Sequence, residues 1–491
     1  MSEIKQLFSQ TLVYGFSSVL ARVLNFLLVP LYTILFIPSE YAIVSEMYAY
    51  AAFIMVLGSC GMETAFFRFS ESTNLSRSKV FGTAFNFLLT NAIIILFFGA
   101  LFYKKIAKLI QHNQNPEYVL LFLFIISLDL ITIIPFALLR QKNKAFKFAS
   151  IKTINIFINI FFNLFFLLFC PYCLDHNFCP EIINVIYSPD FSVGYIFISN
   201  LIASIITLFI LIPDIKKHIG HPDFEVFKKM FYYSWPILIA GVAFIINESA
   251  DKILIKYLLP KGIAMRELGI YSACYKLSIF MTLFVQAYRF AAEPFFFNQF
   301  AKPNAKKVYA LMLEVFVLIA LAIFLFVTLY IDVIKLVIPN SLYHEGIVII
   351  PIVLLANIFL GVYYNLSVWY KVTNRTQYAA FISSFGAICT IFFNILLLPR
   401  YGYIGAAWTT LICYVIMTVI SFYLGKKYFK ISYRTPSITL YFLIALVLFY
   451  VSRFYSTTSY MNIQIDNTIL FVLYLIFIYW QLKKLFKRKY I

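Results

Sequence analysis

The chain has 491 residues, of which 62% are apolar and only 12% are charged, and its mean hydropathy is +0.87. Soluble domains are roughly 45–50% apolar and about 25% charged, so these values exclude an ordinary soluble protein and indicate that lipid is the main solvent. The formal charge of +19 does not indicate a nucleic-acid partner, because the basic residues lie in short loops between apolar runs.

Fourteen apolar stretches are long enough to cross a bilayer as helices, since one crossing takes about 20 residues. The first follows an N-terminus without the basic start and small-residue cleavage site of a signal peptide, so we expect it to remain as a span. The longest connections, Pro171–Asp190 and Asp214–Met230, are too short for a separate soluble domain. The predicted spans are residues 11–36, 43–62, 80–103, 118–139, 148–170, 191–213, 231–258, 269–292, 308–338, 347–370, 377–398, 404–425, 437–452 and 468–482.

The basic residues of the loops are divided unevenly between the two sides of the membrane. With the N-terminus inside, 26 Lys and Arg residues fall in inner loops and nine in outer loops. Cytoplasmic loops of membrane proteins carry such an excess. The count therefore predicts that both termini lie in the cytoplasm, with Lys104–Lys108 as a local exception.

An internal repeat relates the two halves of the chain. Residues 42–48 match 269–275, residues 160–163 match 391–394 as IFFN, and Gly-Tyr-Ile recurs at Gly194 and Gly402, at offsets of 227, 231 and 208. The matches map spans 1–6 onto spans 7–12, and an even number of spans gives both halves the same orientation. We expect an N-terminal six-helix bundle with its linker over 1–230, a second bundle over 231–430, and two extra helices with a basic tail over 431–491.

Five basic residues lie within predicted spans, where each costs about 2.5–3.5 kcal/mol at the centre of a lipid-facing helix. We therefore expect them to face a bundle interior or a water-filled cavity. In span 1, Arg22 and Asn25 lie one turn apart, and we interpret both as candidate ligands for an anionic substrate. Lys276 and Arg289 of span 8 have the same interpretation, with salt bridges between helices as the structural alternative. The five basic residues are Arg22, Lys152, Lys252, Lys276 and Arg289.

Acidic residues within the spans suggest a second role. In span 7, Glu248 and Asp251 lie one turn apart, and Lys252 follows Glu248 at i+4, the spacing of a helical salt bridge. Glu46 lies in span 2. We predict that Glu46, Glu248, Asp251 and Lys252 either couple transport to an ion gradient or form structural pairs. For Lys252 we favour the structural pair.

The loop after span 5 contains Cys170, Cys173, His176 and Cys179, which are residue types that bind zinc. Its predicted periplasmic position makes a Cys173–Cys179 disulfide an alternative, because cysteines oxidise there. Free cysteines without a special role are the third interpretation, and the one we favour. We expect no resident metal.

Motifs of soluble-enzyme chemistry do not occur in the sequence, which has neither a Walker loop nor an H-E-x-x-H helix. No outer loop is long enough to house a catalytic site. We therefore expect a protein that is not an enzyme and holds no cofactor.

Four short stretches carry a family resemblance: residues 12–43, Gly61–Phe69, Asp251–Leu254 with Leu268–Ala273, and Pro399–Ala407. They resemble the polysaccharide-transport branch of the multidrug/oligosaccharidyl-lipid/polysaccharide exporter superfamily, which includes O-antigen flippases and the lipid II flippase. Two positions depart from the family pattern, since Ala42 replaces the usual glycine and Lys252 the usual arginine. Motifs this short indicate the superfamily rather than the substrate.

The resemblance implies an all-α integral membrane protein of about fourteen transmembrane helices, with two six-helix bundles in a V and two C-terminal helices. It implies a flippase that carries a polyprenyl-pyrophosphate-linked oligosaccharide across a bacterial inner membrane by alternating access, for O-antigen, capsule or a related polysaccharide. Related flippases hold the lipid pyrophosphate with cations in their cleft, and Arg22 matches the family's position in the first helix. The expected partners are this substrate and membrane lipids, with coupling to Na⁺ or H⁺ left open, no nucleic acid, and a monomeric chain.

Three other functions are alternatives to this one. Lipid II flipping for peptidoglycan is closely related, and the motifs do not separate it. A cation-coupled multidrug antiporter of the same superfamily would have an acid-dominated cavity and usually twelve spans. A membrane-embedded glycosyltransferase or glycan polymerase would have larger periplasmic loops with paired acids.

Overall fold

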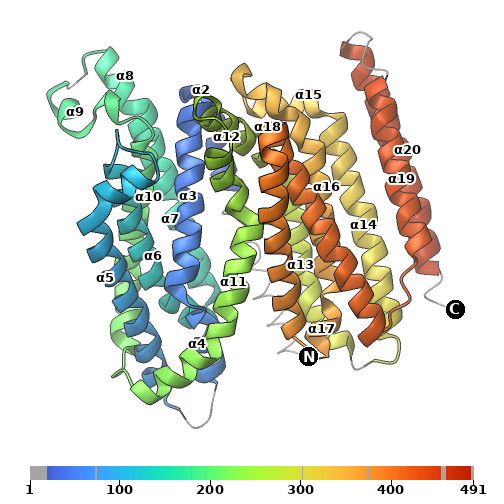
Figure 1. The fold of residues 1–491 in the computed structure, drawn as a ribbon, viewed down its shortest axis with the longest axis horizontal. Coiled ribbons are helices and arrows are strands. Elements are labelled where there is room, and N and C mark those ends of the chain that lie inside the picture. The colour runs from blue at the N-terminus through green and yellow to red at the C-terminus, as the bar shows by residue number, and fades with distance from the viewer. Residues whose placement is uncertain are drawn as a thin grey trace. The chain divides into compact units, whose positions relative to one another are not determined.

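The computed structural model describes residues 19–20, 22–71, 75–178, 180–300, 302–373, 375–454 and 460–487. Within those ranges every regular element is a helix, and no strand occurs (Figure 1). The all-α membrane fold expected from the apolar runs is confirmed.

The chain forms two compact units. Unit 1 comprises Met1–Leu28 and Glu40–Ile253, and unit 2 comprises Val29–Ser39 and Leu254–Ile491. The short stretch Val29–Ser39 belongs to unit 2, where the Tyr343 hydroxyl donates a hydrogen bond to the carbonyl of Phe36 at 2.7 Å. The domain boundaries expected at 230/231 and 430/431 stay predictions.

Unit 1 is a bundle of long helices in which α6 packs against α5 and α10, and α10 packs against α7. Cys60 and Gly61 both adopt left-handed backbone conformations, with φ of 49° and 67°, and this break separates α3 from α4. The helices are α3 (Pro38–Ser59), α4 (Met62–Ser70), α5 (Arg77–Leu109), α6 (Glu117–Gln141), α7 (Ala145–Leu164) with a π-helical turn (Phe165–Phe169), α8 (Cys170–Asp175), α9 (Pro180–Ile186), a 3₁₀ turn (Pro189–Phe191), α10 (Gly194–His218) and α11 (Phe224–Leu258).

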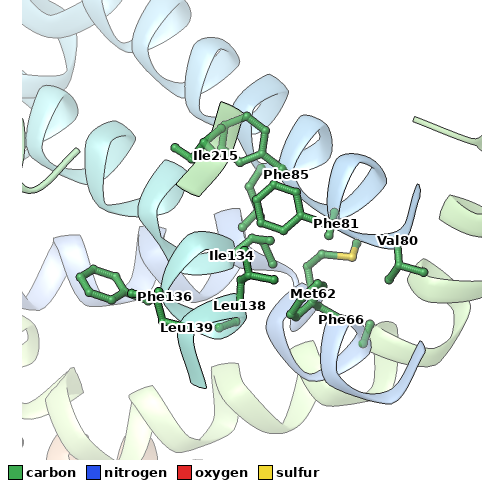
Figure 2. Packing of buried hydrophobic residues seen from close by; sticks show 14 of the residues in the cluster. Met62, Phe66, Val80, Phe81, Phe85, Ile134, Phe136, Leu138, Leu139 and Ile215 are labelled. Atoms are coloured by element: carbon green, nitrogen blue, oxygen red, sulfur yellow. The ribbon is translucent and has the colours of Figure 1, made fainter. Parts of the chain in front are cut away.

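A cluster of buried apolar side chains holds one end of unit 1 together. Figure 2 shows Met62 and Phe66 of α4 against Phe81 of α5 and Ile134 of α6. The rings of Phe66 and Phe81 meet edge to face, with centroids 6.2 Å apart. In lipid, such helix contacts are held by van der Waals packing rather than by escape from water, so the fit of these side chains decides how α4 sits on α5 and α6.

Unit 2 is built around α14, against which α13, α16, α19 and α20 pack. The two extra C-terminal helices are present at the expected places. The elements are α2 (Leu28–Leu35), α12 (Lys261–Lys276), α13 (Ile279–Phe300), α14 (Ala305–Leu329), α15 (Ile331–Ile334), two 3₁₀ segments (Lys335–Val337 and Ser341–Ile349), α16 (Ile350–Leu366), α17 (Val368–Val372), α18 (Gln377–Tyr428), α19 (Thr435–Phe454) and α20 (Tyr460–Lys487).

The longest element, α18, is a helical hairpin rather than one rod. Gly402 lies inside it with φ 57° and ψ −147°, a conformation open essentially to glycine alone. The Thr390 hydroxyl lies 3.4 Å from the Cys413 sulfur, although 23 residues of straight helix would separate them by about 35 Å. Tyr378 and Tyr428, at the two ends of α18, meet with ring centroids 5.2 Å apart. The chain therefore reverses at Gly402, between the spans predicted at 377–398 and 404–425.

Eleven helices within the described residues are long and apolar enough to cross a membrane, or twelve if the bent pair Lys261–Lys276 and Ile279–Phe297 is one span. That count takes α18 as one helix. A shorter apolar helix, Arg22–Leu35, lies in the predicted span 1, whose first residues fall outside the described part of the chain. The exact number of fourteen is not confirmed.

Candidate functional site

The charged residues expected in span 7 lie together on α11. The Lys252 ammonium is 3.5 Å from Asp251 Oδ1 and 3.1 Å from the backbone carbonyl oxygen of Glu248. Asp251 is buried, whereas Glu248 is exposed. Lys252 thus contacts Asp251 and the backbone of its own helix, and its structural role stays a prediction.

Glu46 of α3 is fully buried and has a partner that sequence reasoning missed. Its Oε2 lies 2.8 Å from Nε2 of His112, which follows the end of α5. The histidine side chain is itself 9% exposed. This contact joins the middle of α3 to the chain just after α5.

The remaining expected ligands are exposed. Arg22 and Asn25 lie one turn apart on the helix Arg22–Leu35. Lys276 ends α12 in unit 2 and is also exposed. Arg22 and Asn25 belong to unit 1, and Lys276 and Arg289 to unit 2.

Arg289 belongs to a cluster of charges in unit 2. Its Nε lies 3.2 Å from Glu293 Oε1, one turn further along α13, and its guanidinium stacks over the Tyr364 ring at 4.7 Å. The same carboxylate oxygen lies 2.5 Å from the ammonium of Lys371 on α17. Glu293 therefore serves two cations, which leaves this group of three charges with a net positive charge.

Unit 1 contains a corresponding ion pair that was not predicted. Glu63 of α4 pairs with Arg140 of α6, whose guanidinium also stacks over Phe67 at 5.0 Å. Glu63 and Glu293 are 230 residues apart, and Arg140 and Lys371 are 231 apart, which is the offset of the IFFN repeat. Glu63 lies in the first turn of its helix and Arg140 in the last turn of its own, where the helix dipole stabilises each charge.

The backbone after each basic residue follows the same repeat. The amide of Lys144 donates to the carbonyl of Leu139 at 2.9 Å, and the amide of Arg375 donates to the carbonyl of Tyr370 at 2.8 Å. The repeated asparagines agree as well, since Asn163 and Asn394 are both fully buried. Each donates to the carbonyl four residues earlier, at 2.8 and 2.9 Å. The repeat seen in the sequence is therefore a repeat of structure.

Further ion pairs gather the basic loops at one end of unit 1, which we call the basic end. Lys79 lies 2.8 Å from Asp223, and Lys147 lies 2.5 Å from Asp214. The hydrogen bond from Lys79, together with the backbone amide of Val226, holds the pKa of Asp223 below its usual range. The first pair joins the start of α5 to the segment between α10 and α11, and the second joins the start of α7 to the end of α10. The charge count predicts that the basic end faces the cytoplasm.

The cysteines of the loop after span 5 are only partly described. Cys170 and Cys173 lie in α8, where both are buried and free. Cys179 lies outside the described residues, and the disulfide with Cys173 that the sequence left open is not formed, because Cys173 is a free cysteine. His176 uses Nδ1 in a 2.9 Å hydrogen bond with the Tyr172 carbonyl.

Comparison with known proteins gives one family. The model of a family described as polysaccharide biosynthesis protein matches residues 7–300. No curated protein sequence matches the chain closely enough to count.

Several solved structures share the fold. A structure titled lipid II flippase MurJ, inward closed conformation, has a TM-score of 0.68 at 16% identity, over 96% of this chain and 99% of its own. An inward-facing multidrug resistance MATE family transporter of the MOP superfamily has a TM-score of 0.65 at 11% identity, over 85% and 94%. An outward-facing structure of such a transporter has a TM-score of 0.58 at 12% identity, over 86% and 95%. At these identities the likeness is one of fold.

Proposed function

Because this chain belongs to the polysaccharide biosynthesis protein family, we propose that it is a flippase for a polyprenyl-pyrophosphate-linked oligosaccharide. The substrate would move from the inner to the outer leaflet of a bacterial inner membrane, for O-antigen, capsule or a related polysaccharide. The family match over residues 7–300 is the observation that carries the proposal. The coarser statement, a multi-pass membrane protein with the fold of flippase-type transporters, rests on the family and the fold together.

The chemistry of the substrate fits a chain rich in intramembrane cations. A lipid-linked oligosaccharide has an anionic pyrophosphate, an uncharged glycan and a long apolar tail. The first two need shelter from lipid while the tail stays in it. We propose that Arg22, Asn25, Lys276 and Arg289 receive the head group, with Arg22 as the principal phosphate ligand because a guanidinium forms two parallel bonds to phosphate.

Alternating access requires each unit to keep its shape while it moves. The pair Glu63–Arg140 joins two helices of unit 1, and the pair Glu293–Lys371 joins two helices of unit 2. We propose that each pair stabilises its own unit, at equivalent places in the repeat. The proposed domains are the bundle 1–230, the bundle 231–430 and the two extra helices with the tail, 431–491.

The energy source has two candidates. Moving a net charge of about −2 outward across roughly 100 mV, inside negative, contributes roughly 4.6 kcal/mol. Coupling to Na⁺ or H⁺ is the other candidate, and the buried Glu46–His112 pair and Glu248 with Asp251 are the places proposed for it. Lys252 is proposed as a structural partner of Asp251.

Lipid II flipping is the second candidate function, because the structure with a TM-score of 0.68 carries that title. The matches to multidrug transporters cover 85% and 86% of the chain, whereas the match to the lipid II flippase covers 96% of it. Helices α19 and α20, of 20 and 28 residues, are together shorter than the part of the chain that these matches leave out. This difference favours a lipid-linked substrate over multidrug antiport.

Deleting the gene tests the proposal in cells. We expect surface polysaccharide to disappear while its lipid-linked precursor accumulates in the inner leaflet, out of reach of an externally added glycosidase. Arrest of peptidoglycan synthesis would instead identify a lipid II flippase. Sensitivity to cationic dyes with normal surface glycan would identify an antiporter and overturn the proposal.

A further inference from the structure

A hollow of about 650 Å³ opens at the basic end of unit 1, between α4 and α11. Figure 2 shows Met62 and Phe66 of α4 in the core, so the hollow lies against other faces of that helix. Half of its lining residues are aromatic, and the others are one cation, one acid and one threonine. The lining residues are Thr64, Phe67, Arg68, Phe69, Glu71 and Tyr233.

Arg68 is the cation of this hollow, and its charge is not neutralised. Its guanidinium stacks over the Tyr233 ring at 4.9 Å, and among the described residues no carboxylate lies within ion-pair distance of it. The neighbouring cation Arg140 differs, because it pairs with Glu63. An exposed arginine on a tyrosine ring keeps its hydrogen-bond donors available for a ligand.

The surroundings of the hollow favour an anionic ligand. Burial and the like charges of Lys144, Lys217 and Arg77 lower the pKa of Lys142 at this end of the unit. The lowered pKa shows that several positive charges lie close together here. The negative charge of Glu71 at the edge of the hollow repels an anionic ligand, but this carboxylate is exposed, so water screens its charge. Basic segments beside a span attract the anionic lipids of the cytoplasmic leaflet.

We propose that this hollow binds the phosphate headgroup of a membrane lipid, with Arg68 as the phosphate ligand. The rings of Phe67, Phe69 and Tyr233 form apolar walls for the groups next to the phosphate, and the Thr64 hydroxyl offers a further donor. Both bulk phospholipids and the polyprenyl-pyrophosphate substrate carry this chemistry. The site is separate from the intramembrane ligands proposed for transport, and it does not depend on the proposed function.

Equilibrium binding of labelled lipids to the purified full chain in detergent tests the proposal. The probes are phosphatidylglycerol, a polyprenyl pyrophosphate, and diacylglycerol as the probe without phosphate. We expect Arg68→Ala to weaken binding of a phosphate-bearing probe by about tenfold or more, since hydrogen bonds between charged groups are the strong ones. Glu71→Gln should strengthen the same binding, because it removes a repelling charge.

Arg375→Ala is the matched control, because Arg375 stacks over the Tyr428 ring at 4.6 Å in unit 2 and does not line the hollow. It should leave binding unchanged. Loss with both phosphate probes identifies a general headgroup site, and loss with the pyrophosphate alone identifies a substrate site. Equal affinities of wild type and Arg68→Ala, or equal losses for diacylglycerol, would overturn the proposal. If Arg68→Ala does not fold, an unchanged affinity in Glu71→Gln overturns it as well.

Discussion

The two repeat-related ion pairs should respond differently to an exchange of charges. Glu63 contacts one cation among the described residues, Arg140, whereas Glu293 contacts both Lys371 and Arg289. We expect Glu63→Arg combined with Arg140→Glu to regain most of the stability that either single change loses. Glu293→Lys combined with Lys371→Glu should regain less, because a lysine at position 293 would face Arg289 one turn away, and like charges at i,i+4 repel.

The magnitudes follow from how exposed these groups are. Glu293, Lys371 and Arg289 have side chains 38%, 26% and 45% exposed, and an exposed ion pair contributes about 0.2–1 kcal/mol. Glu293→Gln breaks two such pairs and should cost roughly 1 kcal/mol, about twice the cost of Glu63→Gln. Asp332→Asn is a control for a local pair, since Asp332 contacts Lys335 on its own helical turn at 2.6 Å.

The assay is the thermal midpoint of the purified chain in detergent, followed as the monodisperse fraction in size-exclusion chromatography. Each single change and each exchanged pair is measured under the same conditions. Full recovery in the exchanged pair of unit 2, or equal losses for Glu63→Gln and Glu293→Gln, would refute the reasoning that Glu293 serves two cations.

Three further predictions concern transport, folding and pH. Arg22→Ala should abolish surface glycan while the protein accumulates normally by immunoblot. Arg22→Lys should keep only part of the activity, because lysine has the charge but not the bidentate fork. Normal glycan display in Arg22→Ala would exclude Arg22 from the site. Gly402→Ala should lower the yield of folded protein, at a cost of about 1–3 kcal/mol, because φ is +57° and the new Cβ would lie 2.4 Å from Glu267 Oε2; an unchanged yield would contradict this. Because the pKa of Asp223 is lowered by Lys79, the stability from this pair is present above about pH 4 and is lost as the pH falls further. The difference in thermal midpoint between wild type and Asp223→Asn should therefore vanish in acid, and a constant difference would contradict the pairing.

The length of the apolar runs predicted the helices well. It did not predict helix breaks that depend on the backbone conformation of one or two residues. The reversal at Gly402 falls between two predicted spans, as expected from the sequence. The Gly-Tyr-Ile repeat, at Gly194 and Gly402, marks the start of a helix in both halves. The break between α3 and α4 was not predicted, since it depends on the left-handed conformations of Cys60 and Gly61. A second unpredicted interruption, at Leu277 and Ser278, separates α12 from α13 inside one predicted span without any left-handed residue.

Pairings between distant charges were the harder part of the site. Glu46 and His112 are 66 residues apart. The hydropathy pattern does not indicate which loop residue contacts a buried acid. The pairs Glu63–Arg140 and Glu293–Lys371 did leave a signal, because the IFFN offset of 231, applied to charged residues, relates Arg140 to Lys371. Repeats therefore carry information about long-range contacts that single spans do not.

Transport by the purified chain tests the central claim most directly. The chain would be reconstituted in vesicles with a polyprenyl-pyrophosphate-linked oligosaccharide labelled on its sugar, and an impermeant glycosidase would report the leaflet in which the sugar lies. We predict that the wild-type chain moves the labelled sugar across the bilayer faster than empty vesicles do, and that Arg22→Ala does not. Labelled sugar that stays in its original leaflet with the wild-type chain, in vesicles that do exchange a cationic dye, would contradict the account.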